Sequence, residues 1–294
     1  MKFDIMMRVS NQFLFFIILL FAGMFYAPKS FLETKNIGQK QTREEIIKQY
    51  RLSPDSEVKI ANIPFGAVLI VPVDSDTAEV HILRTASTQA ELACNKIKID
   101  DSSNSLTITG NNNEGCRLQN TSIEQNIVVK LPRKTNVTAN SITGPLRIGE
   151  IEGRGPNYVS DGTGNKILQP SDRAHVIGKG FDGSINIQSI SSAVKLLQGI
   201  GYTNISGVSG PIEIMVRRLG TKGVTVNGTN NTVEIGLGAD INSVLDITEV
   251  RGRIINNAGV TLKTEGKKSH SQIGSGGAAI SISNINGDVI VSRK

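Results

Sequence analysis

Residues 208–214 read Val-Ser-Gly-Pro-Ile-Glu-Ile, and this stretch decides the fold. The pattern is an aliphatic residue, a small polar residue, glycine, any residue, and then two aliphatic residues with one residue between them. A strand alternates its side chains with a period of two, so both isoleucines lie on the same face. The glycine permits a corner that a Cβ would obstruct. The stretch therefore predicts a tight corner followed by a short strand with one buried face.

The same unit recurs through the second half of the chain, so we expect its strands to stack on one another. The glycines of the copies are Gly144, Gly183, Gly210, Gly228, Gly252 and Gly287, which fall 18 to 39 residues apart. Irregular spacing fits stacked turns whose loops differ in length. The pattern favours an all-β chain with a β-solenoid architecture. An antiparallel sandwich with tight glycine turns is the alternative.

The first half of the chain also alternates polar and apolar residues, as strands do. Residues 57–60 and 79–83 show this pattern, and residues 126–131 form a further strand-like run that ends at a proline. Two clean alternations, residues 96–99 and 105–109, are separated by a polar turn and predict a hairpin. Residues 149–180 are rich in Gly, Asn, Asp and Pro, and we expect them to leave the stack as a long loop.

Aromatic residues are concentrated near the N-terminus. Of the nine phenylalanines and four tyrosines, only Tyr50, Phe65, Tyr158, Phe181 and Tyr202 lie beyond Phe31, and there is no tryptophan. The core must therefore consist of Ile, Val, Leu and Ala. Such a core suits narrow, regularly stacked strands.

Residues 13–27 are uninterrupted apolar or small residues, preceded by Lys2 and Arg8. As a helix this run covers about 22 Å, which is short of a bilayer core of about 30 Å. Residues 1–27 are therefore interpreted as a cleavable export signal or as an uncleaved signal-anchor. Residues 28–49 read as a polar tether and residues 50–294 as the β-strand repeat domain. In either case the domain is expected to be extracytoplasmic.

The chain has two cysteines, Cys94 and Cys116. In an oxidising compartment they could close a loop of about twenty residues, which typically stabilises a fold by about 2–4 kcal/mol. They could equally be two separate small apolar residues. Together with the scattered His81, His175 and His270 they do not form a zinc motif.

A β-solenoid can carry polysaccharide-active sites in which carboxylates cluster on one outer face. Glu213 and Glu234 occupy similar outward positions in two copies of the repeat, and Asp172 with His175 is a second possible cluster. The alternative is that outward charges simply keep a strand soluble. The equivalent positions in other copies are not acidic, being Arg147, Asn186 and Ile290. We therefore expect no catalysis and no cofactor.

The formal net charge is +6, and it is spread along the chain. The short basic runs are residues 217–218, 267–268 and 293–294. A nucleic-acid role would need a concentrated patch, so we expect no nucleic-acid partner. Weak attraction to anionic envelope polymers or lipid head groups is one interpretation of these pairs, and ordinary solvated charge is the other.

A resemblance to a known protein family rests on three stretches of sequence. These are residues 129–132 (VKLP), 136–144 (NVTANSITG) and the ending ISNINGDVIVSRK at 282–294. Over roughly residues 50–294 the chain resembles the bacterial family of adhesin-like β-strand repeat proteins of unknown function. The resemblance implies a right-handed β-helix or related β-solenoid that faces outward from a bacterial envelope. It implies no catalytic residues.

Together these observations predict an exported, non-catalytic protein with a binding, adhesion or scaffolding role at the cell envelope. The expected partner is an envelope polymer, a lipid or another envelope protein, with the membrane reached through the N-terminal segment if that segment stays uncleaved. An extracytoplasmic sensor of envelope stress is the second hypothesis. A polysaccharide-active enzyme is the third.

Overall fold

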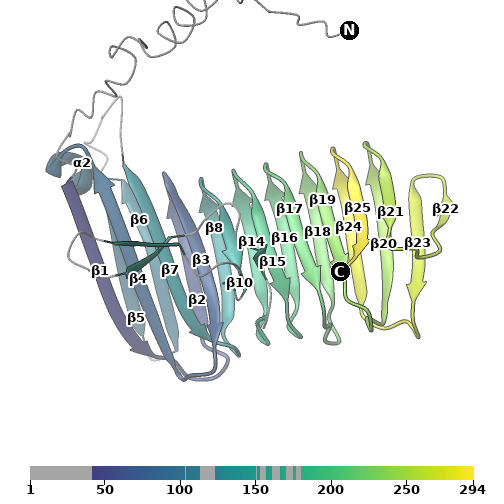
Figure 1. The fold of residues 1–294 in the computed structure, drawn as a ribbon, viewed down its shortest axis with the longest axis horizontal. Helices are drawn as coiled ribbons and strands as arrows, with labels where there is room; N and C mark the ends of the chain where they lie inside the picture. The colour runs from purple at the N-terminus through teal and green to yellow at the C-terminus, as the bar shows by residue number, and fades with distance from the viewer. Residues whose placement is uncertain are drawn as a thin grey trace, which may run out of the picture. The chain divides into compact units, whose positions relative to one another are not determined.

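The computed structural model describes residues 42–294 except residues 103, 113–122, 150, 153–156, 161–165, 170–174 and 177–179. In these residues the prediction of an all-β chain is confirmed: two large sheets, which we call A and B, account for most of the structure (Figure 1). The predicted export or anchor segment, residues 1–27, lies outside the described residues. No helix in the described part of the chain is long and apolar enough to span a bilayer.

Sheet A has ten strands, and sheet B has eleven. In spatial order, sheet A consists of β1 (Thr42–Arg51), β4 (Thr77–Ala86), β7 (Glu124–Pro132), β3 (Gly66–Val73), β9 (Leu146–Ile148), β15 (Val194–Gln198), β17 (Ile212–Val216), β19 (Val233–Leu237), β25 (Val289–Arg293) and β21 (Ile254–Asn257). Sheet B consists of β22 (Lys263–Glu265), β23 (Lys268–Ile273), β20 (Ser243–Val250), β24 (Ala279–Ile285), β18 (Val224–Thr229), β16 (Thr203–Val208), β14 (Ile185–Ile190), β8 (Asn136–Ile142), β2 (Glu57–Ile63), β6 (Ser105–Asn112) and β5 (Asn95–Ser102).

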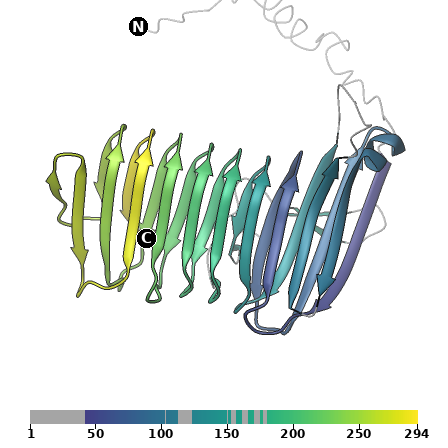
Figure 2. The ribbon, with the colours of Figure 1, turned by 180° about the vertical axis from the view of Figure 1, so that it is seen from behind.

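In the middle of the molecule the chain alternates between the sheets. From β14 to β19 each strand is followed by one in the other sheet, and from β16 onward each pairs in parallel with the strand two places earlier. The register places like residues together: Ile187 opposes Ile205, and Ile212 opposes Val233. The row of strands is seen from both sides in Figures 1 and 2.

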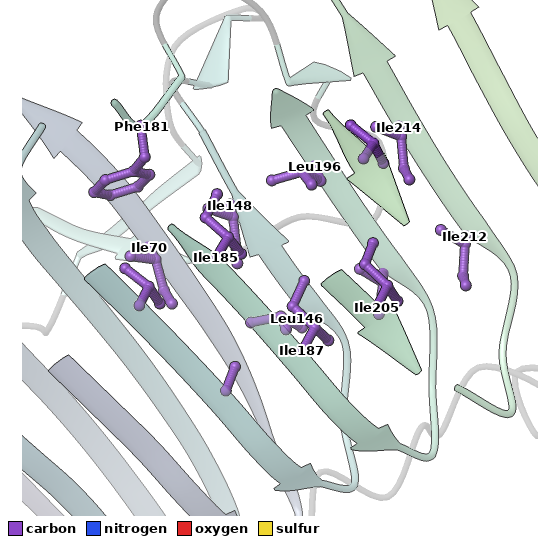
Figure 3. Packing of buried hydrophobic residues seen from close by; sticks show 14 of the residues in the cluster. Ile70, Leu146, Ile148, Phe181, Ile185, Ile187, Leu196, Ile205, Ile212 and Ile214 are labelled. Atoms are coloured by element: carbon purple, nitrogen blue, oxygen red, sulfur yellow. The ribbon is translucent and has the colours of Figure 1, made fainter. Parts of the chain in front are cut away.

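One continuous core lies between the sheets. The inward side chains of both sheets are almost entirely Ile, Val, Leu and Ala, with Phe181 as the one aromatic side chain among the fully buried residues described (Figure 3). Ile187, Ile205 and Ile214 are each 0% exposed. The aliphatic core expected from the composition is therefore confirmed.

Most strands of sheet B contain one residue in the left-handed conformation just before their last inward residue. These residues are Asn62, Ser141, Ser189, Gly207, Gly228, Asn284 and Glu249, with φ between 53° and 68°. The pairing of the following residues, such as Ile63 with Ile142 and Thr229 with Ile285, places the seven in one column. Each bends its strand toward the corner that leads to sheet A. Asn and Gly tolerate this conformation best, and other residues adopt it at a cost.

The stack is interleaved at both ends. The strands β24 and β25 follow β20–β23 in sequence, yet they lie between β18 and β20 in sheet B and between β19 and β21 in sheet A (Figure 1). At the other end, β2 and β3 lie between the later strands β6 and β8 and between β7 and β9, respectively. Each end is therefore built from segments that are distant in sequence.

Three local features complete the fold. The predicted hairpin is confirmed, because β5 and β6 pair antiparallel with Ile99 opposite Ile108. The predicted tether is wrong for residues 42–49, which belong to β1. This edge strand packs Ile46 and Tyr50 against the core, and its charged outer residues protect an open sheet edge. A six-residue helix, α2 (Gln89–Cys94), is capped by the side chain of Thr88 and was not predicted.

The region predicted to be a long loop, residues 149–180, contains two short antiparallel pairs. These are β10 (Ile151–Glu152) with β13 (His175–Val176), and β11 (Asn157–Ser160) with β12 (Lys166–Gln169). The segment therefore leaves the alternation between sheets A and B, as expected, but it is not entirely irregular.

Candidate functional site: the outer face of sheet B

Ten polar side chains cover the outer surface of five neighbouring strands of sheet B, namely β8, β14, β16, β18 and β24. Every one ends in an amide or a hydroxyl, and none is charged. We call this surface the amide–hydroxyl face; it consists of Thr138, Asn140, Asn186, Gln188, Asn204, Ser206, Thr225, Asn227, Ser281 and Ser283. With a strand spacing of about 4.8 Å, the face is about 19 Å wide across the strands.

Parallel pairing sets these side chains in two rows. One row runs from Thr138 to Ser281 and the other from Asn140 to Ser283, with one residue from each strand in each row. The rows are outward because the residues between them, such as Ile187 and Val226, point into the core and are fully buried. The face therefore lies directly over the buried aliphatic core.

Hydrogen bonds along the face fix several of its amides. Asn204 Nδ2 donates to Asn186 Oδ1 at 3.0 Å, across two strands. At the other end, Ser283 Oγ and Asn284 Nδ2 donate to Asn227 Oδ1 at 3.2 and 2.7 Å. Only part of the hydrogen-bonding capacity of an amide is used in this way, since it has two donor hydrogens and two acceptor lone pairs. The remainder is available to a ligand.

Charged groups border the face on both sides. On the β2 side lie Glu57 and Lys59, and on the β20 side lies Asp246, whose Oδ1 is 2.8 Å from His270 Nδ1. The uncharged region is therefore bounded, and it is distinct from the mixed charge of the strands next to it.

Two connected hollows open at the β2–β8–β14 end of the face. The first, of about 400 Å³, is lined by Asp55, Glu57, Ser102, Asn104, Ser105, Asn136, Val137, Thr138, Ser184 and Asn186. The second, of about 240 Å³, shares Asp55, Asn136 and Ser184 with it, and its other lining residues are Asp182, Gly183, Ile200, Gly201, Tyr202, Thr221 and Lys222. Asn136 lines both hollows: its Nδ2 donates to the Asp55 carbonyl at 3.0 Å, and its Oδ1 accepts from Ser184 N at 2.8 Å.

A larger cleft of about 520 Å³ lies next to the second hollow, and Asp182 lines both of them. Its walls mix the apolar Leu52, Val73 and Pro132 with charged groups. Arg133 is held there by Asp182, with Nη2 and Oδ1 3.1 Å apart. Three acidic and three basic side chains line the cleft, namely Asp74, Asp76, Asp182, Arg133, Lys134 and Arg218, so it presents no single sign of charge to a ligand.

The outer face of sheet A differs, because it carries an ion-pair network. Lys195, Glu213 and Glu234 are neighbours in register on β15, β17 and β19. Lys195 Nζ lies 3.1 Å from Glu213 Oε2, and Lys294 Nζ lies 2.9 Å from Glu234 Oε1 and 3.4 Å from Glu213 Oε1. The two glutamates singled out as possible catalytic carboxylates are therefore brought together, but both are bound to lysines.

The ionisation of this network follows from those contacts. Burial disfavours the Glu213 carboxylate, but the hydrogen bond and charge of Lys195, with those of Lys294, outweigh burial and hold the pKa of Glu213 below its ordinary value. Burial likewise works against the ammonium of Lys294, and its bonds to Glu234 and Glu213 nevertheless raise its pKa. A carboxylate held ionised in this way is poorly suited to act as a general acid.

The three positions predicted to be equivalent to Glu213 and Glu234 do not all lie beside them. Arg147 and Ile290 lie in the same row of sheet A. Asn186 does not, because it belongs to β14 in sheet B. Asp172 lies outside the described residues, as does the side chain of His175. In the described part of the chain, no three His, Cys, Asp or Glu side chains gather as metal ligands would.

The six repeat glycines occupy three different environments. At the corner from sheet B to sheet A, a Cβ on Gly144, Gly210, Gly252 or Gly287 would come within 2.5 Å of backbone in the adjacent turn. Gly183 lies at the opposite corner, before β14, where a Cβ would come 2.1 Å from the Thr135 carbonyl oxygen. Gly228 lies within β18 in the left-handed column, with open space around it. The six are therefore not equivalent positions of a single unit.

The cysteines and the basic pairs are placed as follows. Cys94 ends α2, and Cys116 lies outside the described residues, so the disulfide between them stays a prediction. Residues 217–218 and 267–268 are exposed. In the third pair, Arg293 Nη1 donates to the carbonyls of Gly238 and Ala239 at 2.9 and 2.8 Å, and Lys294 belongs to the network on sheet A. The last pair therefore stabilises the fold.

No protein-family model matches the sequence, and no curated protein matches it. Among solved structures, a candidate cell adhesion protein from Clostridium sporogenes ATCC 15579 is 13% identical, with 86% of this chain and 100% of that chain covered and a TM-score of 0.42. A candidate adhesin from Bacteroides fragilis NCTC 9343 is 11% identical, with coverages of 85% and 97% and a TM-score of 0.26. A candidate lipid-binding protein from Parabacteroides distasonis ATCC 8503 is 12% identical, with coverages of 85% and 95% and a TM-score of 0.28. Likenesses this distant assign no ligand to the present chain.

Sequence reasoning missed the amide–hydroxyl face. The signal was present, because the outward positions of five strands contain no Asp, Glu, Lys or Arg. It is hidden because residues 181–187 and 142–148 look like copies of one unit, whereas their strands belong to opposite sheets. Only a correct assignment of strands to sheets brings the ten residues together.

Proposed function

We propose that this chain is a non-catalytic binding and scaffolding protein of the bacterial cell envelope, and that the amide–hydroxyl face is its binding surface. The observation that carries the proposal is the set of ten uncharged outward side chains held in register on five adjacent strands. A soluble strand needs polar outward residues, but charges serve that purpose as well as amides do. Sheet A uses charges, and these five strands use none.

The rigidity of the face supports binding rather than chemistry. Its side chains project from paired strands over a fully buried aliphatic layer, so little conformational entropy is lost when a ligand makes contact. The carboxylates that were considered for catalysis lie on the other sheet and are bound to lysines. In our proposal they stabilise the stack.

The proposal includes the finer fold and the location. The chain passes through sheet B and then sheet A in each turn, and connections between parallel strands are almost always right-handed. We therefore infer a right-handed β-solenoid. Its place outside the cytoplasm rests on residues 1–27, as a cleavable export signal or as an anchor.

Cosedimentation with the producing organism's envelope fragments tests this proposal. The purified full chain is compared with the double variant Asn186→Asp/Asn227→Asp. Both aspartates keep the acceptor oxygen that Asn204, Ser283 and Asn284 use, while adding two charges to the face. The wild-type chain is expected to pellet with the fragments, and the variant to stay largely in the supernatant.

The matched control is Asn230→Asp/Asn257→Asp, which adds the same two charges at exposed positions outside the face. The Asn230 oxygen accepts from Asn286 Nδ2 at 2.6 Å, and aspartate preserves that acceptor too. The control is expected to pellet like the wild type. Equal pelleting of all three proteins would refute the role of the face, and no pelleting of the wild type would refute binding to the envelope.

A further inference from the structure

The hydrogen-bonding groups of the amide–hydroxyl face restrict the chemistry of its ligand. Amides and hydroxyls both donate and accept, and neighbouring positions offer both functions side by side. A matching ligand must therefore carry closely spaced groups that also donate and accept. The hydroxyls of a sugar polymer have this property, whereas a phosphate or sulfate group is an acceptor only.

The charges of the two hollows argue in the same direction. Among the described residues that line them, Asp55, Glu57 and Asp182 are acidic, and Lys222 in the second hollow is the one basic residue. A carboxylate repels an anionic ligand but accepts hydrogen bonds from a neutral hydroxyl. An acidic polymer or an anionic lipid head group would therefore meet repulsion where a neutral sugar would find acceptors.

Tyr202 and the exposed Ile200 supply the apolar component of the second hollow. Tyr202 is half-buried just before β16, its hydroxyl lies 3.4 Å from Thr225 Oγ1 of the face, and it lines the hollow together with Ser184 and Asn136. Aromatic rings with a polar end suit surfaces at which one side of the ligand is apolar and the other is wet. The C–H face of a sugar ring is such a ligand surface.

From these three observations we infer that the ligand is an uncharged polysaccharide. Its chain lies across the strands on the amide–hydroxyl face, and one sugar unit enters the hollows beside Asn136 and Tyr202. This inference rests on the proposed binding function and specifies its ligand class. Hydrogen bonds dominate over stacking in this arrangement, so the affinity per sugar unit is low and length of contact provides the binding strength.

The test is affinity electrophoresis of the purified full chain in native gels at low and high salt. Separate gels contain the neutral or the acidic polysaccharide fraction of the producing organism's envelope, divided by anion exchange. Phosphatidylglycerol vesicles are assayed in parallel by flotation. We expect retardation by the neutral fraction alone, unchanged by salt because no ion pairs are involved.

Variants at Tyr202 link this binding to the site. Tyr202→Ala is expected to weaken retardation by about three- to tenfold, and Tyr202→Phe, which keeps the ring, to retain most of it. Thermal unfolding of both variants checks that the fold is intact. Equal retardation of wild type and Tyr202→Ala would remove the sugar from the hollow and overturn the site assignment.

The other outcomes separate the two proposals. Salt-sensitive binding to the acidic fraction or to the vesicles would overturn the inference in favour of an anionic ligand. No retardation by the neutral fraction, with envelope fragments still pelleting the chain, would overturn the polysaccharide and leave the binding function standing. Failure of the envelope fragments as well would overturn both.

Discussion

Gly144 lies directly against Gly66: a Cβ on Gly144 would come 1.8 Å from the Gly66 carbonyl oxygen. The same relationship links Gly210 with Ser192 and Gly287 with Asn231, always between the corners of adjacent turns. The glycines of these corners are therefore required by close backbone approach. None of the three adopts the left-handed conformation.

This relationship predicts that Gly210→Ala destabilises the fold by about 1–3 kcal/mol, because the methyl group must displace backbone that now lies 2.3 Å away. Gly228→Asn is the matched comparison. Gly228 has φ of 68° and no neighbour within 4 Å, and asparagine already occupies this column at positions 62 and 284. We expect its effect to remain below about 1 kcal/mol.

Urea unfolding of the two variants measures the difference. The explanation by close approach would be wrong if Gly210→Ala unfolded at the wild-type midpoint, or if Gly228→Asn were the more damaging of the two. Unchanged m-values would show that only stability had altered.

A buried amide at the opposite corner predicts a second effect. Gln198 is 2% exposed; its Nε2 donates to the carbonyls of Gly199 and Gly201 at 3.0 and 2.6 Å, and its Oε1 accepts from Thr203 Oγ1. Gln198→Leu leaves those groups without partners, so we expect a loss of about 1–3 kcal/mol. Thermal melts of Gln198→Leu, Thr203→Val and the double variant form a cycle. Full additivity would contradict the hydrogen bond between the two side chains.

The network on sheet A predicts a pH dependence. The pKa of Glu213 is lower in the folded than in the unfolded chain, so its ionised form contributes stability above its ordinary value of 4.5. That contribution is lost as the pH falls through the lower, folded pKa. Lys195→Met should flatten this part of the stability curve, by less than about 1 kcal/mol because Glu213 is partly exposed.

Chemical denaturation from neutral pH to pH 3 tests this effect. Lys48→Met, a change of an exposed lysine on β1, serves as the control and should leave the acid limb unchanged. If the Lys195 variant and the wild type lost stability in parallel below pH 4.5, the lysine would not be the cause of the shift.

The predicted disulfide can be checked on the purified protein. If Cys94 and Cys116 are bonded, denatured but unreduced protein reacts with no maleimide, and reduced protein gains two adducts. We expect Cys94→Ser/Cys116→Ser to be less stable by about 2–4 kcal/mol. Two maleimide adducts without reduction would show that the pairing is absent.

The strands of this chain could be predicted because they depend on local alternation. The hairpin β5–β6 and the buried pair Ile212 and Ile214 follow from a period of two. The three-residue spacing between Ile205 and Val208 breaks that period. The structure explains it, because the left-handed Gly207 takes up the extra residue and lets both side chains point inward.

Other features have no local signal. Helix α2 is too short for helical periodicity, and only the cap at Thr88 marks its start. The order of the turns is also not encoded locally, since every turn presents similar aliphatic rows and any two could pair. The amide–hydroxyl face depends on that order, so it could not be recognised from one copy of the repeat at a time.

The interleaved position of β24 and β25 has a consequence for the timing of folding. Ribosomes complete the strands on both sides of them, β18–β19 and β20–β23, before residues 279–293 are made. Until then the core between these two groups of strands cannot close, because the turn that joins them is missing. A chain interrupted before residue 279 would therefore lack an interior turn, and the turns on both sides of the gap would expose aliphatic surface. Loss of a terminal turn would expose such surface on one neighbouring turn only.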